Sequence, residues 1–181
     1  MPGINKKSNP HAARPVILIG FRGTGKTAIG KRLAERLRLK YISTDEMIEQ
    51  RTGMMIRDFV EQNGWDKFRD IERTAIEEVT DILGAVIDCG GGVIEDAQNM
   101  ERLWERGIVV WVDAEVEDIL ARLSRAADRP LLNQADLKTD VERNYARRLP
   151  LYRRYAQIQV NSSRESVDEI CDRIIVELEN M

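Results

Sequence analysis

Short apolar runs alternate with segments of helical periodicity along most of the chain. The runs fall at 16–19, 41–42, 85–87, 108–112 and 158–160. Between them, apolar residues recur every three or four positions, as they do on one face of a helix, at 28–37, 65–79, 116–123 and 167–178. Parallel strands need connections long enough to hold a helix, so this alternation implies a mainly parallel sheet covered on both faces. The pattern predicts an α/β fold, a three-layer sandwich around a five-stranded parallel sheet.

Two segments depart from this alternation. Residues 1–14 show no period of either kind and predict a flexible N-terminal extension ahead of the fold. Residues 124–138 interrupt the helical period and predict a mobile lid. The length of 181 residues suits one domain with a full hydrophobic core, which we place at 15–181.

Composition excludes several classes of function. The formal net charge of −3 argues against a general nucleic-acid-binding surface, and no apolar run approaches the roughly 20 residues that span a bilayer. Residues 1–14 lack the apolar stretch of a secretory signal, so a cytoplasmic location is expected. Cys89 and Cys171 have apolar neighbours and no metal-ligand spacing, which predicts two buried thiols rather than a disulfide or a zinc site.

A Gly-rich segment separates the first predicted strand from the first predicted helix. Its sequence, GFRGTGKT at 20–27, matches G-x-x-x-x-G-K-[ST] in the strand–loop–helix context that a chance turn would lack. The glycines let backbone N–H groups face a phosphate, and the helix adds its positive N-terminal end. Lys26 is expected to reach the β- and γ-phosphates, and the Thr27 hydroxyl to bind magnesium. The predicted ATP contacts in the loop are Gly23, Thr24, Gly25, Lys26, Thr27 and Ala28.

This P-loop predicts a nucleotide and Mg²⁺ but does not name the phosphoryl acceptor. GTPases, motor proteins and DNA-handling ATPases use the same loop. Large GTPases add a base-reading motif and switch regions that this short sequence does not display. The acceptor must therefore be inferred from other residues.

Six segments carry a resemblance to a known family. They are GFRGTGKTAIGKRLAERL after the first strand, TDEMIEQRTG after the second, FRDIE at 68–72, CGGG at 89–92, RPLL at 129–132 and RLPLY at 148–152. In their order and spacing, the chain resembles the shikimate kinases, which are nucleoside-monophosphate-kinase-like P-loop proteins. The resemblance implies a P-loop kinase fold with a mobile lid, and transfer of the γ-phosphoryl of ATP, with Mg²⁺, to the 3-hydroxyl of shikimate in aromatic amino acid biosynthesis. We expect a monomer whose partners are ATP and shikimate, with no nucleic acid and no membrane.

Asp45 follows the second predicted strand, at the sheet edge where ligands bind in open α/β folds. The resemblance implies that its carboxylate orients the reacting hydroxyl toward the γ-phosphate and accepts its proton. Because Thr44 and Asp45 precede a helical run, capping of that helix is the alternative, and the two roles are compatible. The expected catalytic residues are Lys26, Asp45 and Arg129.

Two arginines and three glycines are implied to contact the substrate. Arg69 lies in an amphipathic segment and, by pattern alone, reads equally well as a solvated charge. The resemblance implies instead that Arg69 and Arg148 clamp the substrate carboxylate, a group that guanidinium binds well. Gly90, Gly91 and Gly92 directly follow the third predicted strand. Their missing side chains predict close approach of the substrate ring to the backbone, and a plain turn is the alternative.

Two further arginines are expected to contact ATP. Arg129 precedes Pro130 in the predicted lid, where it is expected to neutralise charge on the transferred phosphoryl group while the lid excludes water. Arg122 matches a family position that packs on adenine, and a solvated helical charge is the alternative.

One departure from the family pattern concerns the metal. Shikimate kinases usually carry Asp-x-Asp after the second strand, and the first Asp helps to hold Mg²⁺ through water; here that position is Ser43. The third strand ends in Asp88, as a Walker-B strand does, where the family more often has a small or hydroxyl-bearing residue. We hypothesise that the two strand ends are neighbours beside Thr27 and that Asp88 acts in the outer coordination sphere of Mg²⁺. The alternative is that Asp88 binds nearby backbone N–H groups.

Two competing functions remain open. One is a kinase for another polyol acid, and the combination of Asp45, Arg69, Gly91 and Arg148 argues against gluconate more strongly than against quinate. The other is a nucleotide-binding regulatory module without transfer activity, for which Ser43 is the only support.

Overall fold

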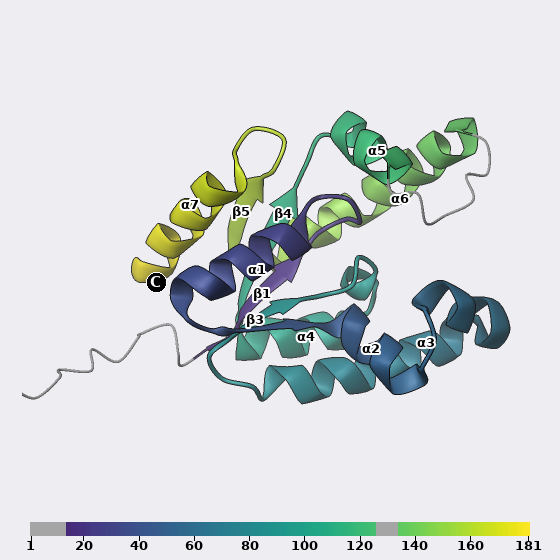
Figure 1. Ribbon diagram of the computed structural model, residues 1–181, viewed down its shortest axis with the longest axis horizontal. Coiled ribbons are helices and arrows are strands. Elements are labelled where there is room, and N and C mark those ends of the chain that lie inside the picture. The colour runs from purple at the N-terminus through teal and green to yellow at the C-terminus, as the bar shows by residue number, and fades with distance from the viewer. Residues whose placement is uncertain (1–13, 126–133) are drawn as a thin grey trace, which may run out of the picture.

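The computed structural model describes residues 14–125 and 134–181, without the side chains of 134–136 (Figure 1). Its strands are β1 (Val16–Ile19), β2 (Lys40–Ser43), β3 (Ala85–Asp88), β4 (Ile108–Asp113) and β5 (Ile158–Asn161). They form one parallel sheet in the order β2-β3-β1-β4-β5. All five predicted strands are confirmed, and so is their parallel arrangement.

Helices cover both faces of the sheet. They are α1 (Lys26–Leu37), α2 (Thr44–Thr52), α3 (Ile56–Thr80), α4 (Ala97–Arg106), α5 (Val116–Arg125), α6 (Gln134–Tyr155) and α7 (Val167–Glu179), with a short 3₁₀ helix η2 (Val93–Glu95). In Figure 1, α1 and α7 lie on one side of the strands and α3 and α4 on the other, which confirms the three-layer α/β fold. None of the helices in the described ranges is both long enough and apolar enough to cross a membrane.

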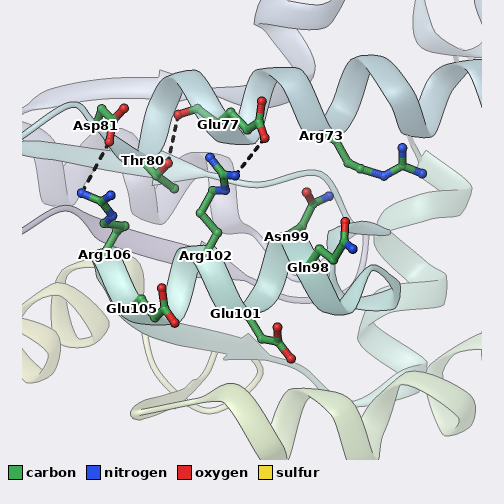
Figure 2. Close-up of a pocket in the computed structure, with 10 residues that line it drawn as sticks. All are labelled: Arg73, Glu77, Thr80, Asp81, Gln98, Asn99, Glu101, Arg102, Glu105 and Arg106. Carbon is green, nitrogen blue, oxygen red and sulfur yellow. Dashed lines mark hydrogen bonds and ion pairs between the residues drawn. The ribbon is translucent and has the colours of Figure 1, made fainter.

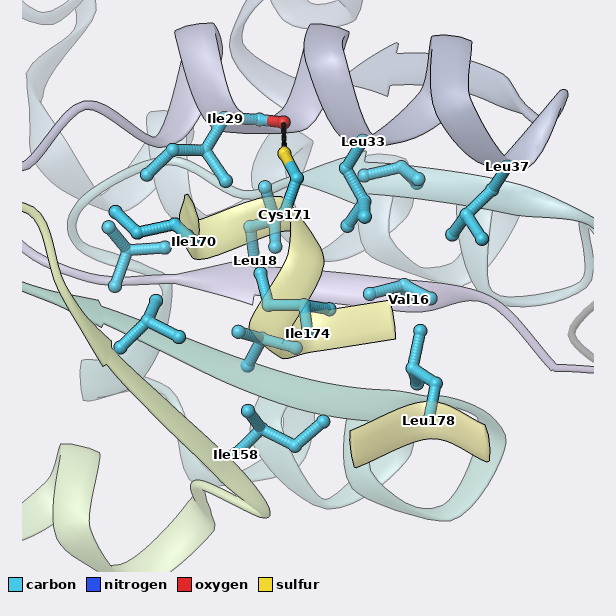
Figure 3. Close-up of a cluster of buried hydrophobic side chains, with 14 of the residues drawn as sticks. Val16, Leu18, Ile29, Leu33, Leu37, Ile158, Ile170, Cys171, Ile174 and Leu178 are labelled. Atoms are coloured by element: carbon cyan, nitrogen blue, oxygen red, sulfur yellow. Dashed lines mark hydrogen bonds between the residues drawn. The ribbon is translucent and has the colours of Figure 1, made fainter. Parts of the chain in front are cut away.

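The central strand β1 explains why the apolar runs do not alternate with polar residues. All four of its side chains are 0% exposed, because each face of the strand packs against a layer of helices. Val16 and Leu18 face the cluster with α1 and α7, which Figure 3 shows, and Ile17 and Ile19 face the opposite cluster. In the first cluster the thiol of Cys171 donates to a backbone carbonyl of α1, and Cys89 is also buried, so both cysteines are buried thiols as predicted.

Helices extend further than the periodicity predicted. α3 begins nine residues before the predicted segment at 65 because a residue with φ of +83°, Gly64, joins two helices across a kink. α4 and α6 were not among the helical segments that the periodicity located by residue. Ser124 and Arg125 end α5, and α6 begins at Gln134, so both ends of the segment predicted as a lid are helical. The middle of that segment, including Arg129, lies outside the described residues.

Candidate functional site

The predicted site residues gather where the parallel strands end. The P-loop follows β1, α2 follows β2, and the three glycines follow β3. Because parallel strands end at the same edge of a sheet, these connections become neighbours. In Figure 1 the loop after β1 lies between the pair α2–α3 and the pair α5–α6.

The P-loop wraps around the start of α1. Gly23 and Gly25 have φ values of +83° and +89°, a backbone conformation that residues with side chains rarely adopt. Gly25 caps α1 without a side-chain acceptor, so the first N–H groups of the helix remain directed at the loop. The ammonium of Lys26 donates to the carbonyl oxygens of Gly20, at 3.0 Å, and Phe21, at 3.3 Å. The loop therefore presents N–H donors and a buried cation at one place.

Asp88 lies directly beside the P-loop helix. Its Oδ2 atom accepts hydrogen bonds from the hydroxyl groups of Thr27, at 2.8 Å, and Tyr41, at 2.9 Å. Burial, together with the nearby Asp88 carboxylate, raises the pKa of Tyr41, so its hydroxyl stays a proton donor. Ser43 pairs with Asp88 in register, so the two strand ends are neighbours beside Thr27 as hypothesised. The partners described for the Asp88 carboxylate are these hydroxyl groups, not the backbone N–H groups of the alternative.

Ser43, not Asp45, caps helix α2. The Ser43 hydroxyl accepts from the backbone N–H of Glu46 at 3.2 Å, so the capping alternative for Asp45 is wrong. Asp45 lies in the first turn of α2, and its Oδ1 atom packs against Gly90. A Cβ atom at Gly90 would lie 2.4 Å from that oxygen, closer than any real contact. The glycine at this position therefore leaves room for the Asp45 carboxylate.

Glu72 is a site residue that sequence reasoning missed. It is 1% exposed and pairs through its Oε2 atom with Arg69, one turn earlier in α3. Burial raises the pKa of the Glu72 carboxyl, the Arg69 guanidinium offsets part of that rise, and the nearby Asp45 carboxylate adds to it. The available signal was spacing, since Glu72 lies midway between Phe68 and Ile76 on the buried face of the helix.

Arg69 of α3 and Arg148 of α6, called here the arginine clamp, converge on Glu95 at the end of η2. Nη2 of Arg148 lies 3.0 Å and Nη2 of Arg69 lies 3.6 Å from Oε2 of Glu95. Nη1 of Arg148 donates to the carbonyl of Gly91 at 3.0 Å. A Cβ atom at Gly92 would lie 2.6 Å from Nη2 of Arg69. The glycines thus leave room for side chains of the protein itself, such as Arg69 beside Gly92. Arg69 is therefore not the solvated charge of the alternative.

Aromatic rings fix the orientation of both clamp arginines. The guanidinium carbon of Arg148 lies 5.3 Å from the ring centre of Phe21 in the P-loop. That of Arg69 lies 5.4 Å from the ring centres of both Trp65 and Phe68. Cation–π contacts at these distances are attractive and leave the edges of the guanidinium groups available for hydrogen bonds. The clamp is therefore held by stacking as well as by ion pairs.

Arg122 connects the P-loop to the segment after β5. It donates to the carbonyl of Gly23 at 3.2 Å and to both the hydroxyl and the carbonyl of Ser162 at 2.9 Å. The Ser162 hydroxyl in turn donates to the carbonyl of Thr24 at 2.7 Å. The alternative of a solvated helical charge is therefore wrong. The other predicted ATP-contacting arginine, Arg129, lies outside the described residues.

The donor set beside the P-loop suits a hard cation. The hydroxyl of Thr27 and the carboxylate of Asp88 offer the oxygen ligands that Mg²⁺ prefers, and they adjoin the phosphate-binding loop. Within 14–125 and 134–181, no three or more His, Cys, Asp or Glu side chains gather into a metal site of their own. A metal held here would therefore depend on phosphate oxygens and water for its other ligands.

A charged groove of about 440 Å³ lies elsewhere, between α3 and α4 (Figure 2). Its walls carry residues of both signs, joined by ion pairs such as Glu77–Arg102 at 2.9 Å. None of the predicted site residues lines it. The candidate site is therefore defined by the converging side chains at the carboxyl edge of the sheet.

Comparisons with known proteins identify the family of this chain. The family model for shikimate kinase matches residues 22–179. The shikimate kinase of Sulfurihydrogenibium sp. (strain YO3AOP1) is 36% identical over 163 residues, which are 90% of this chain and 96% of the relative. The solved structure of the shikimate kinase from Acinetobacter baumannii in complex with shikimate has a TM-score of 0.87 and 33% identity, covering 94% of this chain and 96% of that one.

A gluconokinase from Sinorhizobium meliloti 1021 also has a similar structure, with a TM-score of 0.60 over 94% of both chains. It is only 12% identical, so this likeness shows the fold alone. The family model, by contrast, spans most of this chain. The two shikimate kinases named above align with this chain over nearly their full length. This chain belongs to the shikimate kinase family.

Proposed function

We propose that this chain transfers the γ-phosphoryl group of ATP to the 3-hydroxyl of shikimate, giving shikimate 3-phosphate and ADP for aromatic amino acid biosynthesis. As a member of a transferase family that uses ATP, the chain is an enzyme. The observation that carries the proposal is the convergence of the arginine clamp with Asp45 beside the P-loop. Shikimate combines one carboxylate with three hydroxyl groups, and this arrangement offers a partner for each kind of group.

The nucleotide side of the reaction is assigned to the P-loop. The backbone from Gly23 to Ala28 binds the phosphates, and Lys26 exchanges its two carbonyl partners for phosphate oxygens. Arg122 supports the loop through Gly23, and its proposed packing on adenine rests on the family pattern. Arg129 is proposed to neutralise charge on the transferred phosphoryl group, a role that rests on the family pattern alone.

Magnesium is proposed to bind beside Thr27. When bound, Mg²⁺ neutralises charge on the β- and γ-phosphate oxygens. The Thr27 hydroxyl would be the direct ligand, and the Asp88 carboxylate, in the outer coordination sphere, would accept hydrogen bonds from water bound to the metal. The 2.8 Å contact between these two side chains supports this division of labour. In this family member, Asp88 would supply the charge that Ser43 does not.

The acceptor side is assigned to residues from three helices and from the loop after β3. Arg69 and Arg148 bind the substrate carboxylate, and the backbone at 90–92 lies against the ring. Asp45, which packs against Gly90, orients the 3-hydroxyl and accepts its proton as the bond to phosphorus forms. Holding both reactants in line in this way converts a bimolecular step into an intramolecular one, which is where most of the acceleration is expected to arise.

We also propose that the enzyme acts as a monomer in the cytoplasm. Light scattering of the purified chain measures the oligomeric state directly.

A coupled assay of ADP release against shikimate, quinate and gluconate tests the proposed function. We expect turnover that depends on shikimate, with a lower kcat/KM for quinate and none for gluconate. ADP release that is indifferent to all three acids would exclude the kinase activity, and ATP binding without turnover would favour a regulatory module. Preference for gluconate would contradict the assignment of the clamp.

A further inference from the structure

The Glu95 carboxylate is held by three guanidinium groups. Its Oε2 atom lies 3.0 Å from Nη2 of Arg148 and 3.6 Å from Nη2 of Arg69, and its Oε1 atom pairs with Nη2 of Arg147. The side chains of Glu95 and Arg148 are 21% and 14% exposed, so water screens their contact only in part. A carboxylate of the protein itself therefore lies between the two arginines of the clamp.

Each clamp arginine uses one Nη atom for the scaffold and the other for Glu95. Nη1 of Arg148 donates to Gly91, and Nη1 of Arg69 pairs with Glu72. Among the described residues, Nε of Arg148 is a buried donor without a hydrogen-bond partner. A carboxylate binds guanidinium best through two parallel N–H bonds, such as those of Nε and Nη2. Glu95 engages only Nη2, so a second carboxylate can form this pair of bonds only when Glu95 moves away.

We propose that Glu95 competes with the substrate carboxylate for the arginine clamp and thereby sets the affinity of the enzyme for its acceptor. The inference rests on the proposed function, because it takes the substrate carboxylate to bind Arg69 and Arg148. Substrate arrival exchanges the Glu95 contacts for contacts with the substrate. The observed affinity for shikimate is therefore the intrinsic affinity of the clamp, reduced by the free energy of displacing Glu95.

Arg147 provides the place to which Glu95 withdraws. Arg147 forms an ion pair with the Oε1 atom of Glu95. Its side chain is 58% exposed and therefore lies on the solvent side of the clamp. A carboxylate that rotates toward Arg147 keeps one charged partner and regains water. Displacement then costs less than breaking all three ion pairs, because one of them is kept.

Glu95→Gln tests the proposal, because it keeps the shape of the side chain and removes its charge. We expect Kd and KM for shikimate to fall about tenfold, which corresponds to removing a competing contact of about 1.4 kcal/mol. The kcat value and the KM for ATP should stay within about twofold of wild type, since Glu95 touches neither the P-loop nor Asp45 in the described contacts. Glu77→Gln, which removes the same charge from an ion pair in the groove between α3 and α4, is the matched control and should change none of these values.

The dependence on substrate charge separates competition from a structural role. Binding of shikimate methyl ester, measured by calorimetry, should gain nothing from Glu95→Gln, because the ester does not compete for the guanidinium groups. Arg147→Gln should change the Kd for shikimate by less than about twofold, because the ion pair between Arg147 and Glu95 is present both before and after Glu95 leaves the clamp. The double variant should match Glu95→Gln alone, because Arg147 acts only through Glu95.

Unchanged or weaker shikimate binding in Glu95→Gln would overturn the proposal and make Glu95 a support of the clamp. An equal gain for acid and ester would overturn it as well. If Glu95→Gln is unstable, Glu95→Asp, whose shorter side chain reaches the clamp less well, should show a smaller fall in Kd, and a rise would count against competition. Failure of the proposed function is distinct from these outcomes, because the wild-type enzyme would then not phosphorylate shikimate at all.

Discussion

The carboxyl group of Glu72 is an acid that water barely reaches. A buried carboxylate is unfavourable unless it is paired, and here Arg69 provides the pairing while Asp45 opposes it. Burial raises the pKa of Glu72 in the folded state. Protonation of this carboxyl group therefore contributes fully to the free energy of unfolding below the unfolded-state pKa, and the contribution is lost as the pH rises through the folded-state pKa. Arg69 thus has two acidic partners at once, the buried Glu72 and Glu95.

Asp88→Asn is expected to weaken the dependence of the reaction on Mg²⁺. The amide keeps hydrogen bonds to Thr27 and Tyr41 but loses the negative charge, so the Mg²⁺ concentration for half-maximal activity should rise about tenfold. Adding Ser43→Asp should restore part of the loss, because residues 43 and 88 are paired strand ends. Titration of Mn²⁺ in the presence of ADP gives the same comparison without turnover.

Asp81→Asn is the control for this experiment, since Asp81 is an exposed acid at the far end of α3. Metal affinity and turnover that are the same in Asp88→Asn and wild type would disprove the outer-sphere role.

Single residues could be named from the sequence where a motif fixes them, and were missed where their environment depends on distant contacts. Lys26 and Thr27 follow from a local pattern whose geometry the loop itself determines. Glu95 owes its environment to arginines of α3 and α6, which no local pattern reveals, whereas the position of Glu72 midway between Phe68 and Ile76 was a local signal. Asp45, Arg69 and Arg148 were named through family resemblance, and their roles in catalysis and binding stay predictions.

At the scale of elements, the end of β3 and the first turn of α2 meet at Gly90. Helix α2 directly follows β2, which is the neighbour of β3 in the sheet. The Asp45 carboxylate fills the space that a side chain at residue 90 would need. The geometry of the acceptor site therefore depends on how closely this helix approaches the strand.

Gly90→Ala should reduce kcat by tenfold or more, because a displacement of roughly 1 Å at the reacting group can cost about 100-fold in rate. Gly53→Ala is the contrasting variant: its φ of +66° makes the substitution strained, but no atom lies within 4 Å of the new Cβ. It should lower the free energy of unfolding by about 1 kcal/mol and leave kcat and KM unchanged. A folded Gly90→Ala variant with the kcat of wild type would show that Asp45 does not have the proposed role.

Helices and strands could be predicted where the burial of their side chains leaves a clear pattern of apolar residues in the local sequence. Runs such as 16–19 and 85–87 are apolar throughout because both faces of their strands are buried. α4 and α6 escaped prediction because much of their surface is solvated, and α6 also contains Pro150 in its interior. The start of α3 depends on the kink at Gly64, where a glycine normally indicates a break.

At the scale of the whole molecule, the clamp connects parts of the chain that are far apart in sequence. Arg69 belongs to α3 on one side of the site, and Arg148 belongs to α6 on the other. A ligand that binds both side chains stabilises their relative placement, and it binds the native state alone. Ligand binding is therefore expected to raise the free energy of unfolding of the entire domain.

Shikimate at 100 times its Kd should stabilise the enzyme by about 2.7 kcal/mol, which corresponds to a rise in Tm of roughly 5–10 °C for a domain of this size. Arg148→Lys should lose most of this rise, because ammonium cannot provide paired N–H bonds, yet keep the rise caused by ADP with Mg²⁺. Arg153→Lys, an exposed position on the same helix, should keep both. Differential scanning calorimetry makes the measurement, and a full shikimate response in Arg148→Lys would contradict the clamp assignment.

The central place of β1 has a consequence for biosynthesis of the protein. The ribosome makes this wholly apolar strand well before its neighbours β3 and β4. A nascent chain that stops before β4 leaves one edge of β1 unpaired and both of its faces incompletely covered, which favours aggregation. Folding of the phosphate-binding loop is therefore tied to completion of β4, so the nucleotide site is expected to form only after β4 has been translated.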